Sequence, residues 1–268
     1  MGSFQTNTLK VFQSQLFKTT CSVIKTKESI IVVDPNWLPR EIETIQAYVD
    51  EVRGERDLYV IYTHSDFDHV IGSGAFPDAK SIASKRLQNN PEKESVMREI
   101  TAFDQEYYLT RNYTPSYPDV DFVIEKDGEQ LTIGEVTLTF YLAPGHTNDG
   151  LFTVIEPYGI FLAGDYLSEV EFPFIYSSYS DYKETIRKAG TLLEKHSISV
   201  LVPGHGSATE CIEEIRNRLR FSEWYLNELT NPSPDLEQKL NESFMFFEGM
   251  KESHKENRRI VERELGLP

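Results

Sequence analysis

The chain has 268 residues, with 43 Asp and Glu against 27 Lys and Arg, so its formal net charge is −16. Such a surface would repel a phosphate backbone over most of its area, which argues against nucleic acid as a partner. No run approaches the roughly 20 apolar residues that a membrane-spanning helix needs, so no membrane association is expected.

The two cysteines and the N-terminal residues bear on where the protein works. Cys21 and Cys211 are far apart and outside any CxxC pattern, so neither a disulfide framework nor a cysteine-rich zinc site is expected. We expect both side chains to be buried, as free cysteines commonly are. Residues 1–17 lack a basic segment followed by a continuous apolar core, which favours a soluble, cytoplasmic protein.

Three short β-rich runs come first, at residues 9–17, 21–27 and 29–35, with polar or turn-prone residues between them. They predict a meander of three strands. Residues 38–52 predict an amphipathic helix, because Pro39 suits a first turn and apolar residues recur every three to four positions. These apolar positions are Ile42, Ile45, Tyr48, Val49 and Val52.

A further strand and a helical elaboration follow. Residues 57–64 form a nearly continuous apolar run, which is typical of a strand covered on both faces. From residue 84 to about residue 120 the chain is polar and aromatic, and residues 91–111 predict one helix or two short ones.

Strand signals resume in the middle of the chain. Residues 120–133 contain Asp127 and Gly128, a pair that predicts a hairpin turn. The other strands of this second meander are predicted at residues 135–143, 151–157 and 159–165.

Helical patterns dominate the last third of the chain. Residues 181–195 and 208–230 predict helices, and a strand is predicted between them at residues 197–206. The segment that starts at residue 231 is expected to pack back on the body through apolar residues at helical spacing. These are Leu236, Leu240, Phe244 and Phe247.

Two β-rich halves, each with helices outside, predict an α+β fold of the four-layer αβ/βα sandwich type. No linker, low-complexity tract or short repeat interrupts the chain. We therefore expect one domain over residues 1–268, with a helical elaboration at about 84–120 and a C-terminal helical extension at about 232–268.

Candidate metal ligands follow four of the predicted strands. They are His64, Asp66, Asp68 and His69 in "THSDFDH", His146 in "APGHTND", Asp165 in "AGDY" and His205 in "PGHG". Turn chemistry accounts for Gly, Pro and Asp at such places, but it does not account for the histidines. Histidines and carboxylates at the ends of adjacent strands point into one common mouth, and six or seven of them suit two neighbouring cations.

This ordered set resembles the metallo-β-lactamase fold superfamily over most of residues 8–230. The usual first motif of that family is HxHxDH, followed by a later histidine, a bridging aspartate and a last histidine. The resemblance implies two divalent metal ions per chain, and Asp34 in "IVVDP" matches the structural aspartate of the family. It assigns one ion to His64, Asp66 and His146 and the other to Asp68, His69 and His205, with Asp165 bridging both.

One position departs from the family pattern, because Asp66 stands where the second histidine is usual. One hypothesis is a degenerated site that has lost the first metal. The other is a substitution that makes the site harder and more anionic, so that manganese or iron competes with zinc, the metal we expect first. Flavodiiron proteins of the same superfamily also place a carboxylate here, but no flavodoxin-like segment follows within these residues, so flavin redox chemistry fits poorly.

The predicted function is a metal-dependent hydrolase that acts on a small molecule. A metal-bridged hydroxide would cleave an ester, thioester, lactone or phosphodiester, with Asp68 as the catalytic residue that orients the water. Two alternatives remain open: a di-iron or mono-iron oxidoreductase of the same fold, and a non-catalytic metal-binding sensor module.

Other notable side chains carry weaker predictions. The aromatic residues near the elaboration and after Asp165 could form a substrate wall, or they could pack under loops or at a subunit contact, which leaves a homo-oligomer open. His196 is expected to be structural or at the surface, and His254 to be solvated among charges. The aromatic residues of the elaboration are Phe103, Tyr107, Tyr108, Tyr113 and Tyr117.

Overall fold

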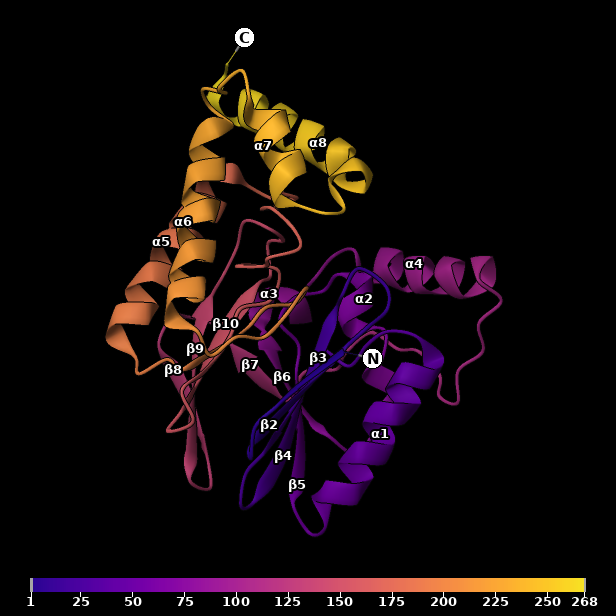
Figure 1. Cartoon of the computed structure of the whole chain (residues 1–268). Helices are drawn as coiled ribbons and strands as arrows, with labels where there is room; N and C mark the ends of the chain where they lie inside the picture. Colours follow the sequence, from indigo (N-terminus) through magenta and orange to yellow (C-terminus); the bar gives the residue numbers. More distant parts are fainter. Residues whose placement is uncertain (1, 268) are drawn as a thin grey trace.

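Two β-sheets face each other between two outer layers of helices in the computed structural model, which describes residues 2–267 and the side chains of residues 4–267 (Figure 1). The predicted four-layer αβ/βα sandwich is confirmed. The first sheet has seven strands in sequence order: β1 Gly2–Gln5, β2 Leu9–Gln13, β3 Thr20–Lys25, β4 Ser29–Val33, β5 Asp57–Ile61, β6 Lys80–Ser84 and β7 Phe122–Ile124. The second has five in the order β12 Val200–Val202, β11 Ile160–Leu162, β10 Leu151–Glu156, β9 Val136–Leu142 and β8 Glu129–Ile133.

The pairing of the strands follows the length of their connections. Strands β1 to β4 pair antiparallel through short turns, and β4 to β7 pair parallel across longer segments that carry helices. In the second sheet β8 to β11 form the predicted antiparallel meander, and β12 joins β11 in parallel after a long helical connection.

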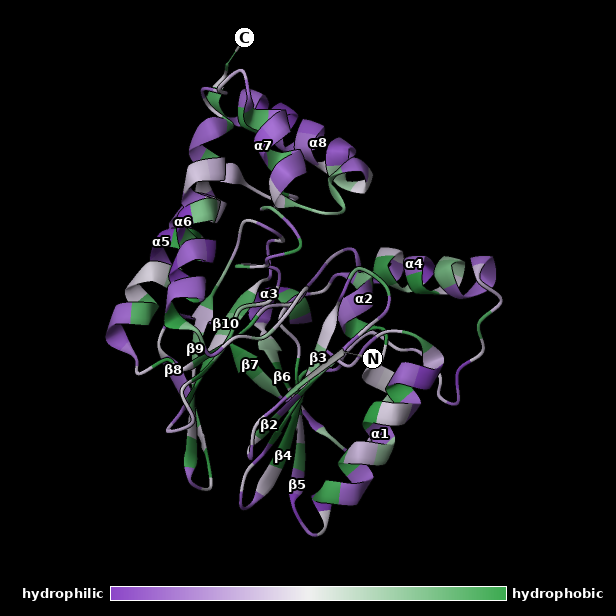
Figure 2. Ribbon diagram, viewed as in Figure 1, coloured by the Kyte–Doolittle hydropathy of each residue, from purple (hydrophilic) through white to green (hydrophobic). Residues whose placement is uncertain are grey.

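Strand β4 shows why the central runs are apolar throughout. Ile30 and Val32 face the outer helices, whereas Ile31 and Val33 pack between the two sheets. Both faces of the strand are therefore buried, and Figure 2 shows hydrophobic colour along the central strands.

Helices cover the outer face of each sheet. Helix α1, Pro39–Arg53, packs Ile42, Ile45 and Val49 on the first sheet, as its spacing predicts. Helices α5, Tyr179–Lys195, and α6, Ile212–Glu228, cover the second sheet. The remaining helices are α2 Phe67–Val70, α3 Lys85–Gln88, α4 Lys93–Glu106, α7 Leu236–Ser243 and α8 Phe247–Leu265, with a 3-10 turn at Ser73–Ala75.

The C-terminal helices pack on the second helical layer, as predicted. Leu236, Leu240, Phe244 and Phe247 are all buried in the same core as α5 and α6. In Figure 1, α7 and α8 lie above the upper end of the sandwich, and α4 projects to the right below them. The upper end of the sandwich is thus covered from two sides by helices that lie far apart in the sequence.

Three strand predictions need correction. Strands β1 and β6 were not predicted, because four or five residues with few large apolar side chains give little periodic signal. The prediction of a hairpin at Asp127 and Gly128 is wrong, because β7 pairs with β6 in the first sheet and β8 pairs with β9 in the second. Gly128 adopts φ +81°, so the turn chemistry is real, but it serves a crossing between sheets.

Two side chains are placed differently from the sequence prediction. His254 was expected to be solvated, but it lies on the buried side of α8 and is 2% exposed, and its Nδ1 lies 2.9 Å from the Tyr225 hydroxyl. Cys211 was expected to be buried and is exposed just before α6, whereas Cys21 is buried as expected. Both errors arise because packing between helices, rather than local sequence, decides which residues are covered.

None of the helices within residues 2–267 is both long and apolar enough to cross a bilayer.

Candidate metal centre

The seven predicted metal ligands lie together at the upper end of the sandwich, where strands of both sheets end. His64, Asp66, Asp68 and His69 follow β5 of the first sheet, and His146, Asp165 and His205 follow β9, β11 and β12 of the second. Because β9, β11 and β12 run in the same direction, their carboxyl ends meet at one edge.

Part of the segment after β5 is a helix. Asp68 and His69 belong to the short helix α2, and Asp66 lies just before its first residue. The backbone N–H of His69 donates to the Asp66 carbonyl oxygen at 3.0 Å. This turn of helix folds the motif back on itself, so that its ligands reach two different groups.

The side chains form two groups, each compact enough to hold one metal ion. One consists of His64, Asp66, His146 and Asp165, and the other of Asp68, His69 and His205; within each group the donor atoms lie within 4.8 Å of one another. Asp165 also reaches the second group, since its Oδ1 is 3.1 Å from His69 Nε2 and its Oδ2 is 3.2 Å from His205 Nε2.

Distances in the first group match those between ligands of one metal. His146 Nε2 lies 3.2 Å from Asp66 Oδ2 and 3.1 Å from Asp165 Oδ2, and His64 Nε2 lies 3.7 and 3.5 Å from the same two oxygens. Donor atoms about 2.0 Å from a tetrahedral zinc ion are about 3.3 Å from each other. The four donor atoms are thus arranged around a common point.

Two of the donor atoms have no hydrogen-bond partner within the described part of the chain. These are His64 Nε2 and Asp165 Oδ1, both buried. An unpaired buried polar atom is costly, so a native site that leaves two of them normally holds a ligand. The donor set of imidazoles and carboxylates fits a divalent cation.

Close backbone approach explains the glycine before His205. A Cβ atom on Gly204 would lie 2.1 Å from Asp165 Oδ1 and 3.0 Å from His69 Cε1. Gly145, before His146, has φ +129° and packs against the backbone of Tyr182. Glycines that look like ordinary turn residues in the sequence therefore let the ligand loops close around the centre.

Each of the four histidines points Nε2 inward and is held from behind at Nδ1. For His69 the partner is Asp34 Oδ2 at 3.0 Å, and for His64 it is the Thr63 hydroxyl at 2.9 Å, which itself donates to Asp34 Oδ2 at 2.6 Å. His146 Nδ1 lies 2.8 Å from the Phe174 carbonyl oxygen, and His205 Nδ1 lies 2.9 Å from that of Phe17. Such contacts set the tautomer and ring orientation of metal-binding histidines.

The carboxylates make the centre strongly attractive to positive charge. Burial would lower the pKa of His146, but Asp165 and Asp66 outweigh it and raise the pKa to about 10. Burial and His69 would lower the pKa of His64, but Asp165 and Asp66 raise it to about 10 as well. Burial would raise the pKa of Asp165, yet the four surrounding histidines hold it well below its usual value. The same field that favours protonated imidazole favours a cation.

A cavity of about 540 Å³ opens onto the centre. Five of the seven predicted ligands line it, and the other lining residues were not predicted as a group. These others are Phe17, Trp37, Phe67, Glu99, Glu171, Phe174, Tyr176, Gly249, Met250 and Ser253. They come from the β2–β3 loop, the β4–α1 loop, α2, α4, the segment after Asp165, and α8, and only Phe67 lies within a predicted ligand motif. A hollow of about 740 Å³ lies elsewhere, under residues 113–121, and none of the seven ligands lines it.

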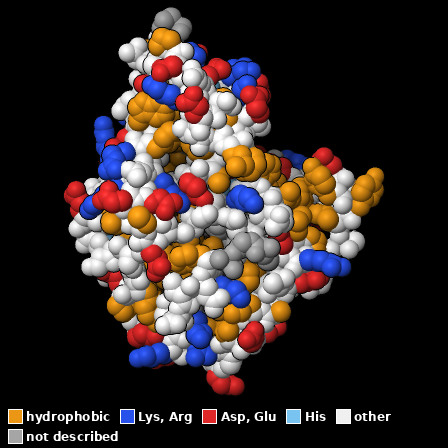
Figure 3. All heavy atoms as spheres, in the orientation of Figure 1, with side chains coloured by type: hydrophobic (Ala, Val, Ile, Leu, Met, Phe, Trp, Pro, Cys, Tyr) orange, Lys and Arg blue, Asp and Glu red, His pale blue; other side chains and the backbone are white. Residues whose placement is uncertain are grey.

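The aromatic predictions are met only in part. Phe174 and Tyr176, from the segment after Asp165, do line the cavity. Tyr107 and Tyr108 at the end of α4 are 57% and 94% exposed and do not line it. The face drawn in Figure 3 shows hydrophobic side chains gathered on its right, over α4.

Glu171 is the lining residue with the most unusual environment. Its Oε1 lies 3.7 Å from His205 Nδ1. Burial, opposed by His205 and reinforced by Asp165 and Asp68, raises the pKa of Glu171 to about 7. In the sequence, Glu171 stands in "SEVEF" close to Glu169, and no pattern there indicates that Glu171 would be the buried one beside a predicted ligand.

The family model of the metallo-beta-lactamase superfamily matches residues 15–205, well over half of the chain. The chain belongs to the metallo-beta-lactamase superfamily. All seven ligands lie inside the matched residues, and the variant HxDxDH motif falls in the two ligand groups.

Solved structures with the same fold include a sulfatase. A double mutant of the sec-alkylsulfatase PisA1 is 15% identical with a TM-score of 0.72, covering 100% of this chain and 50% of that one. The inverting sec-alkylsulfatase Pisa1 from Pseudomonas sp. is 15% identical with a TM-score of 0.69, covering 89% of this chain and 43% of that one. This chain thus spans about half the length of the sulfatase.

A metallo-beta-lactamase family protein from Thermus thermophilus is similar over most of both chains. It is 19% identical with a TM-score of 0.61, covering 84% of this chain and 81% of that one. At these identities the likeness concerns the fold alone.

Proposed function

We propose that this chain is a metal-dependent hydrolase that holds two divalent ions and cleaves an ester, thioester, lactone or phosphodiester of a small molecule. The observation that carries the proposal is the contact of Asp165 with all four histidines. Its two oxygens lie between 3.1 and 3.5 Å from the four Nε2 atoms. A carboxylate in that position can bridge two ions that share a water.

The residues divide the work as follows. His64, Asp66 and His146 would hold one ion, Asp68, His69 and His205 would hold the other, and Asp165 would contribute to both. When bound, such a pair of ions lowers the pKa of a shared water toward about 7 and polarises the oxygen that gains charge. Asp68 Oδ2 accepts a hydrogen bond from the Thr19 hydroxyl at 3.2 Å, which helps to fix the orientation of the carboxylate that would position the water.

Zinc is the first expectation for the metal, and Asp66 makes manganese or iron competitive. Asp66 Oδ2 contacts both histidines of its group, which supports a ligand role in place of the usual second histidine. The first group then offers two imidazoles and two carboxylates, a harder set than three imidazoles.

A chelation experiment tests the proposal. The purified protein would be stripped with a chelator, reloaded with zinc, manganese or iron in turn, and given generic esters, thioesters, lactones and phosphodiesters. We expect close to two ions per chain by elemental analysis and turnover only after reloading. One ion or fewer per chain would favour a degenerated first site, and activity indifferent to complete metal removal would refute the proposal.

An iron oxidoreductase is the second candidate, because the carboxylate-rich first group suits iron. An iron-dependent, oxygen-sensitive absorption spectrum would favour it over hydrolysis. Saturable metal binding without turnover on any substrate class would favour the sensor module. Cleavage of a sulfate ester is suggested only by the likeness in fold to the alkylsulfatase.

We also propose that the described residues form one domain, which the shared core of α5, α6, α7 and α8 supports. A cytoplasmic location is compatible with two free cysteines.

A further inference from the structure

Resting on the proposed hydrolase function, we propose that the cavity selects substrates with an apolar group and no negative charge outside the group that reacts. We further propose that Glu99, on α4, is a specificity-determining residue that disfavours anionic substrates and favours cationic ones.

The apolar part of the selection comes from the walls of the cavity. Phe17 and Tyr176 line it while remaining 68% and 54% exposed, so each leaves ring surface open to a ligand. The Phe17 ring lies 5.4 Å from that of Trp37, and the Tyr176 ring lies 4.9 Å from that of His146. Met250 of α8 adds a further apolar contact. Aromatic faces can bind both apolar groups and cations.

The charges around the cavity leave no counter-ion for an anionic substrate. Five lining residues are carboxylates, and none of the residues that line it is a lysine or an arginine. Two divalent ions bring four positive charges, and histidines are neutral when they bind a metal. Even with Glu171 set aside, four carboxylates balance these four charges. An additional carboxylate, phosphate or sulfate group on a substrate would therefore be desolvated without a partner.

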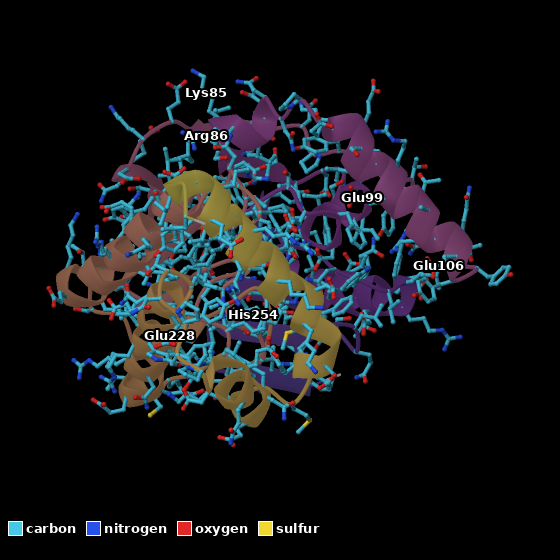
Figure 4. The ribbon with its side chains drawn as sticks, turned by 90° about the horizontal axis from the view of Figure 1, so that it is seen from above. Lys85, Arg86, Glu99, Glu106, Glu228 and His254 are labelled. Atoms are coloured by element: carbon cyan, nitrogen blue, oxygen red, sulfur yellow. The ribbon has the colours of Figure 1, made fainter. Side chains whose placement is uncertain are left out.

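Glu99 is the lining carboxylate that stands apart from the ligands. It lies on the side of α4 that faces α8, whereas Glu106 lies at the far end of the same helix (Figure 4). Burial and the charge of Asp66 raise the pKa of Glu99, against the lowering effect of Arg98, so the field of the centre reaches this side chain. Arg98 lines a shallow groove with Met97 and Thr101 instead of the cavity.

The two cations of helix α3 are engaged elsewhere. Lys85 pairs with Glu125 at 2.8 Å, and Arg86 donates to the Asn148 side chain at 2.8 Å. Both lie at the edge of the view in Figure 4, away from Glu99. The charge of Glu99 is therefore not offset from that side.

Three aryl esters with one acyl group test the inference, with trimethylammonium, tert-butyl or sulfonate on the leaving phenol. Each kcat/KM is divided by the rate of uncatalysed hydrolysis, and each variant is compared with the parent protein so that intrinsic reactivity cancels. We expect the parent to rank the cation above the neutral ester and the anion last. Relative to the neutral ester, Glu99→Gln should lower kcat/KM for the cation and raise it for the anion by about threefold each, and both changes should be smaller at high salt.

Glu106→Gln is the matched control, because it removes the same charge from the same helix outside the cavity. We expect it to leave all three rates unchanged. Equal effects of Glu99→Gln and Glu106→Gln, or a parent protein that prefers the sulfonate, would overturn the inference.

Binding to the metal-loaded protein separates this inference from the proposed function. Phenyltrimethylammonium and benzenesulfonate would be titrated by calorimetry, with no turnover needed. Selective binding of the cation, weakened in Glu99→Gln, would support the inference even if no ester is cleaved. Turnover without any charge preference would refute the inference and leave the hydrolase function standing.

Discussion

Replacing Asn257 with alanine should destabilise the fold and loosen the first metal group, although Asn257 is far from every ligand in sequence. Asn257 is on the buried side of α8 and is 1% exposed. The Nδ2 group donates to the Pro173 carbonyl oxygen at 2.6 Å and to the Tyr225 hydroxyl at 2.9 Å, and Oδ1 accepts from the Ile175 backbone N–H at 2.8 Å. Between these two backbone contacts lies Phe174, whose carbonyl oxygen holds His146 Nδ1.

The magnitude follows from the groups that would lose a partner. In Asn257→Ala, the Ile175 N–H and the Pro173 carbonyl are left buried and unpaired, while the Tyr225 hydroxyl keeps its contact with His254. Each orphaned group costs about 1–3 kcal/mol, so the two together should lower the free energy of unfolding by about 2–6 kcal/mol. Freeing the backbone around residue 174 should also weaken metal binding by about tenfold, as loss of support behind a metal ligand usually does.

Two measurements are needed, because a purely structural role would change only the first. Urea unfolding gives the stability, and competition with a chelator in the absence of urea gives the metal affinity of the folded protein. Asn227→Ala, an exposed asparagine on α6, is the control and should change stability by less than about 0.5 kcal/mol. Equal stability of the two variants would refute the hydrogen-bond reasoning, and unchanged metal affinity in Asn257→Ala would refute the link to His146.

Three further predictions concern the ligands themselves. Asp66→Ala should empty the first group, whereas Asp66→His should stay metallated and shift its metal preference toward zinc. Elemental analysis measures both effects. If the parent and both variants have the same metal content and selectivity, Asp66 does not contact a metal. Asp165→Asn should lose both ions and all turnover, while the Asp181→Asn control, at an exposed position, should keep both. If Asp165→Asn still binds the same number of metal ions per chain as the parent, Asp165 does not bridge them. Because the pKa values of His64 and His146 are raised to about 10, both side chains carry a proton at pH 7 that metal binding must displace. Calorimetry in buffers of different ionisation enthalpy should therefore detect proton release on metal binding. This release should disappear above about pH 10. A heat of binding that is the same in all buffers at pH 7 would contradict it.

The sequence by itself determined the local elements and the chemistry of the ligands. The apolar runs of β4 and β5 and the spacing in α1 reflect burial on two faces or one, which depends on a residue and its near neighbours. Histidines directly after strands are rare enough as turn residues that "THSDFDH" and "PGHG" stood out without any structure. The net negative charge likewise follows directly from the excess of glutamate and aspartate in the sequence.

Only the tertiary structure decided which side chains surround the cavity and support the centre. Glu99, Met250 and Asn257 come from helices that carry no motif, and their position depends on how α4 and α8 pack across the end of the sandwich. The same packing buries His254, and the pairing of β7 and β8 with different sheets overrides the hairpin that Asp127 and Gly128 predict. These outcomes depend on contacts between segments tens to hundreds of residues apart, for which periodicity and turn propensity carry no information.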